Sequence, residues 1–281
     1  QTNYAFREKY FLSASIRTDG SSSFGKNERY GSYWSMGLGW VVTKESFMKR
    51  TKGWLDYLKF RGSFGPAGNS AAILDQIRFD NLVLFTYLNN TVVVPNLDYN
   101  PGNPSIQWEK TFAWDAGLEL RAIKERFRLV IDIYSKKTTN LIANNVGIPL
   151  ATGFATLTDN IGDIKNSGIE VALSTEIIRS KNFRWSLSGN WSRNRNRLTK
   201  SFFPDVFPLT SNGLINRVGQ EYNSFYLPTW AGVNPANGRP MWIDTTGKSN
   251  ENYNAARYEI AGKAQPDGFR SILIINHHGK L

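Results

Sequence analysis

Residues 160–197 read NIGDIKNSGIEVALSTEIIRSKNFRWSLSGNWSRNRNR and contain two alternating stretches joined by a short turn. Mostly apolar residues take every second position from Ile169 to Ile177, and the alternation restarts at Phe183 and continues to Trp191. A period of two is typical of a strand with one apolar and one polar face. These residues therefore predict a long β-hairpin whose two faces differ in chemistry.

The length of the two strands bears on what their apolar face contacts. Strands of soluble proteins usually have about 5–6 residues, whereas a tilted strand that crosses a bilayer needs about 9–11. Both strands reach the longer range, and Trp185 and Trp191 flank the apolar part of the second one, as an interfacial aromatic girdle would. The hairpin fits a transmembrane β-barrel, and a long hairpin of a soluble β-protein is the alternative.

Composition excludes several classes of protein. The chain has 281 residues, of which 14% are aromatic and none is cysteine, so disulfide frameworks and cysteine-rich metal sites are excluded. No apolar run reaches the length of about 18 residues that predicts a transmembrane helix. The net charge of +11 invites a nucleic-acid interpretation, but basic residues are spread over turns and polar faces, and the densest run, residues 193–197, ends a strand. We expect no cofactor and no nucleic-acid partner.

The same two-faced pattern recurs along the chain. Further strands are predicted at residues 10–16, 29–42, 58–65, 108–121 and 126–134, with short strands at 82–88 and 91–94, one or two helical turns at 45–54, a long loop at 202–216, and later strands at 222–230 and 239–245. The connections near Ile123 and Ser180 are short, whereas residues 70–107 and 136–160 form long ones. Outer-membrane barrels combine tight periplasmic turns with long outer loops. We therefore predict an all-β fold, an antiparallel transmembrane β-barrel.

Four segments of the chain carry a resemblance to a known family. They are residues 17–25 (RTDGSSSFG), 58–69 (LKFRGSFGPAGN), 103–111 (NPSIQWEKT) and 160–170 (NIGDIKNSGIE). In this order and spacing the chain resembles the SusC/RagA-type TonB-dependent transporters of the Bacteroidetes outer membrane. Pro66 and Ala67 depart from the resemblance, since the family usually has a small polar residue there.

The resemblance implies a location, a function and partners. It implies a β-barrel in the lipid of the cell outer membrane that imports glycan or peptide oligomers, with a SusD-like surface lipoprotein over its outer mouth and TonB as the source of energy. A plugged transporter barrel has about 22 strands, whereas a chain of this length holds roughly ten. We expect residues 1–268 to be part of such a barrel, with the plug domain and TonB box outside this chain. Residues 269–281 look like an atypical tail, truncated or frame-shifted.

Four carboxylates on polar strand faces are the strongest candidates for catalysis. Asp115 and Glu119 share one face and could mimic the paired carboxylates of glycoside hydrolases. We rather expect them to line a water-filled lumen with Lys or Arg partners, and we interpret Glu170 and Glu176 in the same way. We therefore expect no enzyme activity and assign no catalytic residue.

The remaining candidates concern metals, phosphates and substrates. His277 and His278 could touch a metal but lie in the atypical tail, so we predict no metal site. Gly37 and Gly39 do not precede a helix, which excludes a phosphate-binding loop of the usual kind. Tyr99 and Trp230 could stack on sugar rings or could pack within loops. No substrate-binding residue is assigned.

Two other classes of protein remain as alternatives to the transporter. The first is a soluble or surface-attached β-rich binding module, such as an adhesin. The second is an enzyme of the glycoside-hydrolase type. The apolar strand faces separate the first alternative from a barrel, because only a barrel turns them toward lipid.

Overall fold

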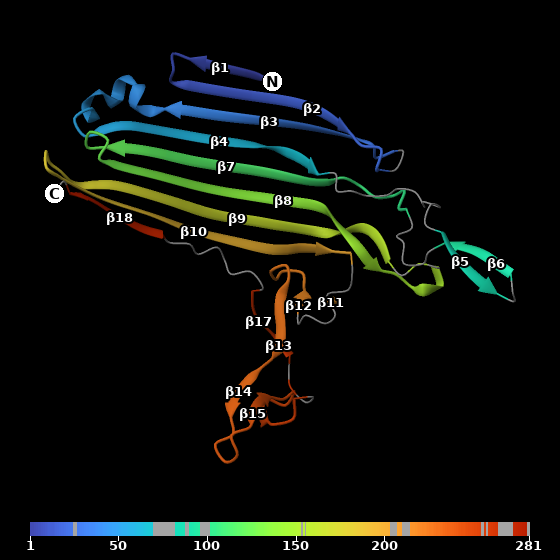
Figure 1. Cartoon of the computed structure of the whole chain (residues 1–281). Helices are drawn as coiled ribbons and strands as arrows, with labels where there is room; N and C mark the ends of the chain where they lie inside the picture. Colours follow the sequence, from blue (N-terminus) through green and yellow to red (C-terminus); the bar gives the residue numbers. More distant parts are fainter. Residues whose placement is uncertain are drawn as a thin grey trace.

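The structure, a computed structural model, describes residues 1–24, 27–69, 82–87, 90–95, 102–152, 154, 156–202, 207–209, 214–253, 256, 258–263 and 272–279. Its main feature is a nine-stranded antiparallel sheet in the order β1-β2-β3-β4-β7-β8-β9-β10-β18 (Figure 1). The strands are β1 (Thr2–Phe6), β2 (Tyr10–Gly20), β3 (Tyr30–Val41), β4 (Leu55–Asn69), β7 (Glu109–Ala122), β8 (Phe127–Gly147), β9 (Thr156–Arg179), β10 (Phe183–Ser201) and β18 (Ile272–Gly279). The sheet is curved and open, as expected for part of a barrel wall.

The strand register gives the sheet one apolar and one polar face, because residues directly opposite each other in antiparallel strands share a face. One row across seven strands consists of Tyr10, Trp40, Phe60, Leu118, Ile131, Val171 and Trp191. The next row, on the other face, consists of Phe11, Gly39, Arg61, Gly117, Asp132, Glu170 and Ser192. The apolar face is solvent-exposed in the chain alone, with Leu38 52% and Phe60 44% exposed. A contiguous apolar face of this extent requires a covering surface.

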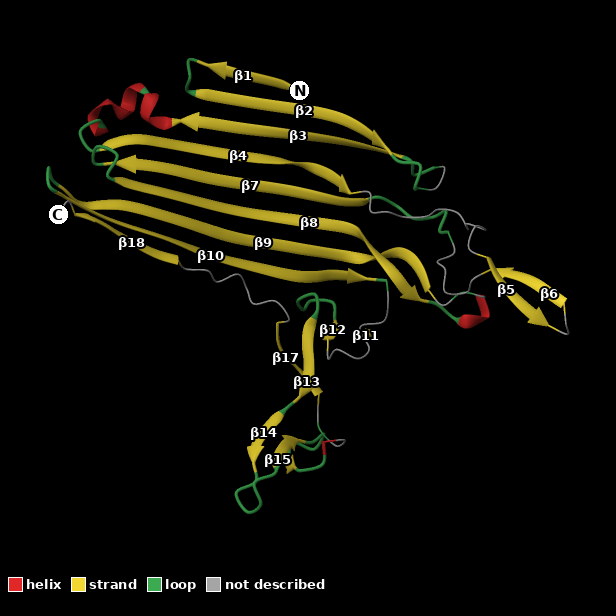
Figure 2. Cartoon of the chain, viewed as in Figure 1, coloured by secondary structure: helices red, strands yellow, loops and turns green. Residues whose placement is uncertain are grey.

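The two ends of the sheet differ in the length of their connections (Figure 2). At one end, which we call the short-turn end, residues 7–9, 123–126 and 180–182 link neighbouring strands, and residues 42–54 hold the short 3-10 helices η1 (Val42–Lys44) and η2 (Ser46–Thr51). The other end, the long-loop end, carries the strands β5 (Leu82–Tyr87) and β6 (Asn90–Pro95) and the 3-10 helix η3 (Leu150–Thr152). The predicted helical turns at 45–54 and the two short strands are thus confirmed.

The predicted loop at residues 136–160 is wrong. β8 continues to Gly147 and β9 already begins at Thr156, so the two strands form a hairpin that projects beyond the neighbouring strands. Polar residues such as Lys136 and Asn166, which lie opposite each other, interrupt the apolar alternation there, yet the backbone ladder continues through several register shifts. Backbone pairing needs no apolar side chains, so hydropathy alone cannot detect this extension.

Beyond β10 the chain forms two small sheets outside the main one (Figure 1). They contain β11 (Phe207–Leu209), β12 (Leu214–Asn216), β13 (Ser224–Pro228) and β17 (Tyr258–Lys263), and β14 (Trp230–Val233), β15 (Pro240–Ile243) and β16 (Ser249–Asn250). Leu198 of β10 joins the four-stranded one to the main sheet, because its N–H donates to the Gln220 carbonyl and its carbonyl accepts from Gly219 N–H, both at 2.8 Å. The predicted strand at 222–230 is divided between β13 and β14, and the predicted loop at 202–216 contains β11 and β12.

The tail returns to the main sheet. β18 pairs antiparallel with β10, from Phe183 opposite Gly279 to Asn190 opposite Ile272. The backbone of residues 272–279 is therefore a strand, although their sequence does not alternate. The division of the chain at residue 268 stays a prediction.

Candidate functional site

A charged network on the polar face surrounds Arg61 of β4. Its Nη2 donates to Asp132 Oδ1 on β8 at 2.6 Å, and its Nε lies 3.6 Å from Glu119 Oε1. Its Nη1 lies 3.9 Å from Asp115 Oδ2, and Asp115 also accepts a hydrogen bond from the Ser63 hydroxyl. The expectation that Asp115 and Glu119 have a basic partner is confirmed. Because the guanidinium and the three carboxylates are partly exposed, these ion pairs contribute little to the free energy of unfolding.

Gly117 allows the Arg61 side chain to cross β7 and contact Asp132 on β8. It lies between Arg61 and Asp132 in the strand register. A Cβ at Gly117 would lie 2.4 Å from Asp132 Oδ1 and 2.9 Å from Arg61 Cζ. Only glycine therefore leaves the path of the guanidinium open.

We expect Gly117→Ala to displace Arg61 and to destabilise the intact protein by up to about 1 kcal/mol, because the added methyl group moves the ends of two flexible side chains and breaks a partly exposed ion pair. Gly39→Ala is the matched control, since Gly39 lies in the same row and its Cβ would make an ordinary 3.4 Å contact with Phe11 Cβ. Urea unfolding in lipid vesicles measures both variants. Adding Asp132→Asn to Gly117→Ala should lower the free energy of unfolding little further, since the ion pair between Arg61 and Asp132 is already broken. Equal destabilisation by the two alanine variants would refute this role of Gly117.

The other carboxylates have separate surroundings. Glu176 forms ion pairs with Arg179 and, at 3.9 Å, with Arg184, beside the turn between β9 and β10. Its expected basic partners are therefore confirmed. Glu170 lies opposite Asp132 in the strand register. Among the residues that the structure describes, no group of three or more His, Cys, Asp or Glu residues could hold a metal ion.

A packed aromatic cluster lies at the long-loop end and unites distant parts of the chain. Phe24 and Ile106 are fully buried, and Tyr33 and Trp108 are nearly so. The rings of Phe24 and Trp108 stack with centroids 4.4 Å apart, and Tyr33 meets Trp108 edge-on at 6.0 Å. The Trp108 indole N–H donates to the Glu28 carbonyl at 2.7 Å. We call these four buried side chains the loop-end cluster.

Side-chain amides fasten the loop-end cluster to the β8–β9 hairpin. Asn160 Oδ1 accepts from Gln107 N–H at 2.9 Å, and its Nδ2 donates to the carbonyls of Gln107 at 3.1 Å and Asn140 at 2.8 Å. Asn103 Nδ2 donates to the Thr158 carbonyl at 3.1 Å. Asn160 thus provides hydrogen-bond partners for Gln107 and Asn140, which lie just beyond the last β7–β8 pair, Lys110 and Thr139.

Gly31 of β3 and Gly68 of the neighbouring β4 leave room for the Tyr33 ring in the cluster. A Cβ at Gly68 would lie 1.9 Å from the Tyr33 hydroxyl oxygen, and one at Gly31 would lie 2.2 Å from it. All four segments that carry the family resemblance therefore contribute to one structure at the long-loop end. The sequence revealed the four segments one by one and did not reveal that they meet in the fold. Phe24 and Trp108, two apolar residues next to polar turn residues, were the signal that could have indicated a shared core.

The remaining candidates lie elsewhere or outside the described residues. Trp230 is 58% exposed and meets Trp242 edge-on at 6.2 Å, and Trp242 in turn meets Tyr253 at 5.1 Å. Packing within the small sheet thus covers part of the Trp230 ring. Tyr99 and the side chains of His277 and His278 lie outside the described residues. No helix in the described part of the chain is long and apolar enough to cross a membrane.

At the short-turn end, the Glu45 carboxylate joins three strand-end side chains. It accepts from Tyr10 Oη at 2.6 Å, from Lys9 Nζ at 3.0 Å and from Trp40 Nε1 at 3.2 Å. The Tyr10 hydrogen bond, followed by that of Lys9, lowers the pKa of Glu45 below its ordinary value of 4.5. Glu45 thus ties the connector 42–54 to β2 and β3.

The lowered pKa of Glu45 predicts a dependence of stability on pH. Because the folded state holds the proton more weakly than the unfolded state, this carboxylate stabilises the fold above pH 4.5 and loses that effect as the pH falls further. Glu45→Gln should lower the melting temperature of the intact protein at pH 7 and lower it by less at pH 3. Tyr10→Phe should reproduce part of the loss at pH 7. An equal loss at both pH values would contradict the assignment.

The geometry defines a class of protein before any comparison. A curved sheet of long strands with an exposed apolar face, a polar face and unequal ends is the wall of a membrane-spanning β-barrel. Residues 1–269 match the family model described as "TonB dependent receptor-like, beta-barrel". The chain belongs to this family, and it is part of an outer-membrane barrel.

Individual relatives agree with this assignment. The chain is 32% identical over 274 residues to TonB-dependent receptor P39 of Formosa agariphila, covering 93% of this chain and 25% of that protein. It is 33% identical over 268 residues to TonB-dependent receptor SusC of Bacteroides thetaiotaomicron, covering 87% and 26%. The solved structure of the RagAB peptide transporter superposes with a TM-score of 0.83 at 25% identity, covering 98% of this chain and 30% of that one. The resemblance to SusC/RagA-type transporters is confirmed, and the chain spans about a quarter of the curated relatives' length.

Proposed function

We propose that this chain is a barrel portion of a TonB-dependent transporter that imports glycan or peptide oligomers with a SusD-like surface lipoprotein. The match of residues 1–269 to the receptor barrel family carries the proposal. The peptide alternative is supported by the similarity to the RagAB peptide transporter, and the glycan alternative by the resemblance of the four segments to SusC/RagA-type transporters. TonB would supply the energy.

The role of this portion is physical and involves no covalent step. The apolar face holds the sheet in lipid, and the polar face lines the passage. Arg61 keeps Asp115 and Asp132 in place on that face, so the wall presents a fixed pattern of charge to the passage. The loop-end cluster braces the rim, which is where a surface lipoprotein would dock.

Uptake in living cells tests this function. We expect deletion of the encoding gene to abolish import of one class of fluorescent oligomer, either oligosaccharides or oligopeptides. A plasmid copy should restore import, and a protonophore should block it, since TonB uses the proton gradient. Import that is unchanged by the deletion, or insensitive to the protonophore, would contradict the proposal.

A second measurement separates a transporter from an enzyme. Asp115→Asn and Glu119→Gln remove the two candidate carboxylates without changing their size. A transporter carrying both changes should still import its oligomer and release no cleavage products. If the changes abolished hydrolysis of the oligomer in a purified sample while the protein stayed folded, the chain would belong to an enzyme.

A further inference from the structure

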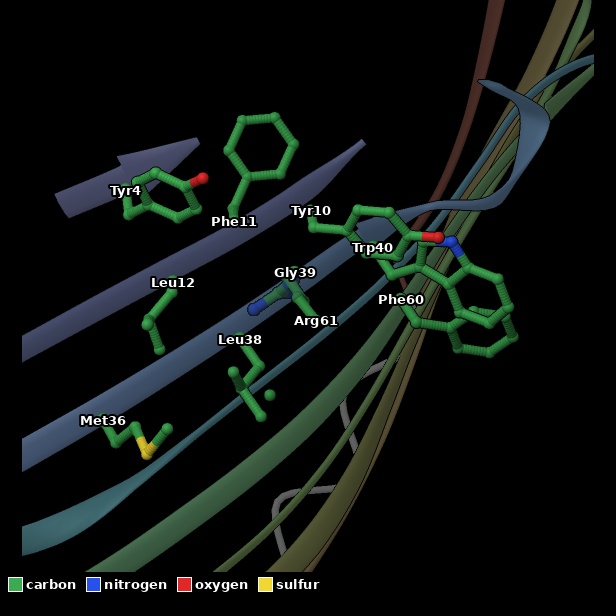
Figure 3. Close-up of a pocket in the computed structure, with 11 residues that line it drawn as sticks. Tyr4, Tyr10, Phe11, Leu12, Met36, Leu38, Gly39, Trp40, Phe60 and Arg61 are labelled. Carbon is green, nitrogen blue, oxygen red and sulfur yellow. The ribbon is translucent and has the colours of Figure 1, made fainter. Parts of the chain in front are cut away.

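A hollow lies on the apolar face near the short-turn end (Figure 3). It has a volume of about 610 Å³, and Leu12, Leu38 and Gly62 form its floor. The side chains of Trp40 and Phe60, in the adjacent row, rise beside it. The hollow exists because Gly62 has no side chain, whereas Leu38 and Phe60 beside it have large ones. Its lining is almost entirely apolar, so it fits a hydrocarbon chain.

The hollow adjoins the connector 42–54. Tyr10 and Trp40 line the hollow, and their polar atoms reach Glu45 of the connector at 2.6 Å and 3.2 Å. Tyr and Trp side chains, which are apolar with one polar atom, are enriched at the boundary between the hydrocarbon and the headgroups of a membrane. The short-turn end of an outer-membrane barrel faces the periplasm. The connector therefore lies at the level of the headgroups of the periplasmic leaflet.

The connector presents a positive charge that the protein does not neutralise. Two acidic residues are already paired: Glu45 with Lys9 at 3.0 Å, and Glu8 with Lys44 at 2.5 Å. The nearby Asp56 carboxylate accepts a hydrogen bond from the Glu125 N–H. Within the described residues, the exposed basic side chains of the connector with no ion pair are those of Lys49, Arg50 and Lys52.

Aromatic side chains accompany these charges. Phe47 and Trp54 lie in the same connector and are 64% and 56% exposed. Exposed aromatic rings next to clustered basic residues are typical of segments that lie in a membrane interface and bind anionic headgroups.

We propose that the hollow and the connector form one binding site for an anionic phospholipid of the periplasmic leaflet. An acyl chain occupies the hollow over Gly62, and the phosphate lies against Lys49, Arg50 and Lys52. The apolar lining and the uncompensated charge each match one half of this ligand. A protein partner would satisfy the charge but not explain a hydrocarbon-sized hollow on the lipid face.

Lipid binding to the intact receptor tests this site. The delipidated receptor is titrated with dioleoyl phosphatidylglycerol or dioleoyl phosphatidylcholine, and retained lipid is counted by native mass spectrometry. We expect phosphatidylglycerol to bind at least about tenfold more tightly, and Lys49→Gln with Arg50→Gln to remove this preference. The matched control is Lys124→Gln with Lys181→Gln, which removes two charges from other turns at the same end and should leave the preference intact.

A second variant addresses the hollow. Leu38→Trp fills it from a position that is 52% exposed, so folding should be retained, and lipid retention should fall while the connector charges remain. Inorganic phosphate should not displace the bound lipid. Equal binding of the two lipids by the unchanged receptor, an equal loss in the control variant, or displacement by phosphate alone would overturn the proposal.

Discussion

Trp108→Ala should lower the free energy of unfolding of the intact receptor by about 3–5 kcal/mol, the usual cost of truncating a buried aromatic side chain. Trp108 is 4% exposed, stacks on Phe24 and donates its indole N–H to the Glu28 carbonyl. Its removal leaves a cavity and an unpaired carbonyl at once. Urea unfolding in lipid vesicles gives the free energy.

The effect of Trp108→Ala should also be local. Because Ile106 and Tyr33 pack in the same cluster, limited proteolysis should cut the long-loop end faster, while the short-turn end stays protected. Trp230→Ala is the control, since Trp230 is 58% exposed and lies in a separate small sheet. If both variants lost the same stability, the loop-end cluster would not be the brace that its packing suggests.

Leu118→Arg should lower the free energy of unfolding by about 2–4 kcal/mol if the apolar face meets the middle of the bilayer, because a cation must then be buried in hydrocarbon. Leu118 lies between Phe60 and Ile131 in the apolar row. The measurement is again unfolding in vesicles, together with the fraction of protein recovered in the membrane.

A matched change on the other face controls for strand position. Val130 lies opposite Glu119 in the adjacent row, on the polar face. Val130→Arg should therefore be tolerated within about 1 kcal/mol, since a new cation there meets water and a carboxylate. If the Leu118 variant left the membrane and appeared folded in the aqueous fraction, the chain would be a soluble β-protein instead.

Local sequence periodicity was sufficient for much of the fold. The β9–β10 hairpin follows from alternation within a single stretch, and its apolar face was correctly assigned because the period of two is a property of each strand alone. The polar continuation of β8 to Gly147 was missed, since backbone pairing leaves no hydropathy signal. The basic partner of Asp115 and Glu119 was expected as a type of residue, but its identity as Arg61 was not.

The sequence by itself determined the two-faced strands, the unequal ends and the family, because each rests on residues close together in the chain. The tertiary structure alone decided which distant residues meet. Arg61 and Asp132 are 71 positions apart, and Trp108 and Glu28 are 80 apart. Such contacts depend on strand order and register, which a period of two leaves open, because any shift by two residues preserves the same faces.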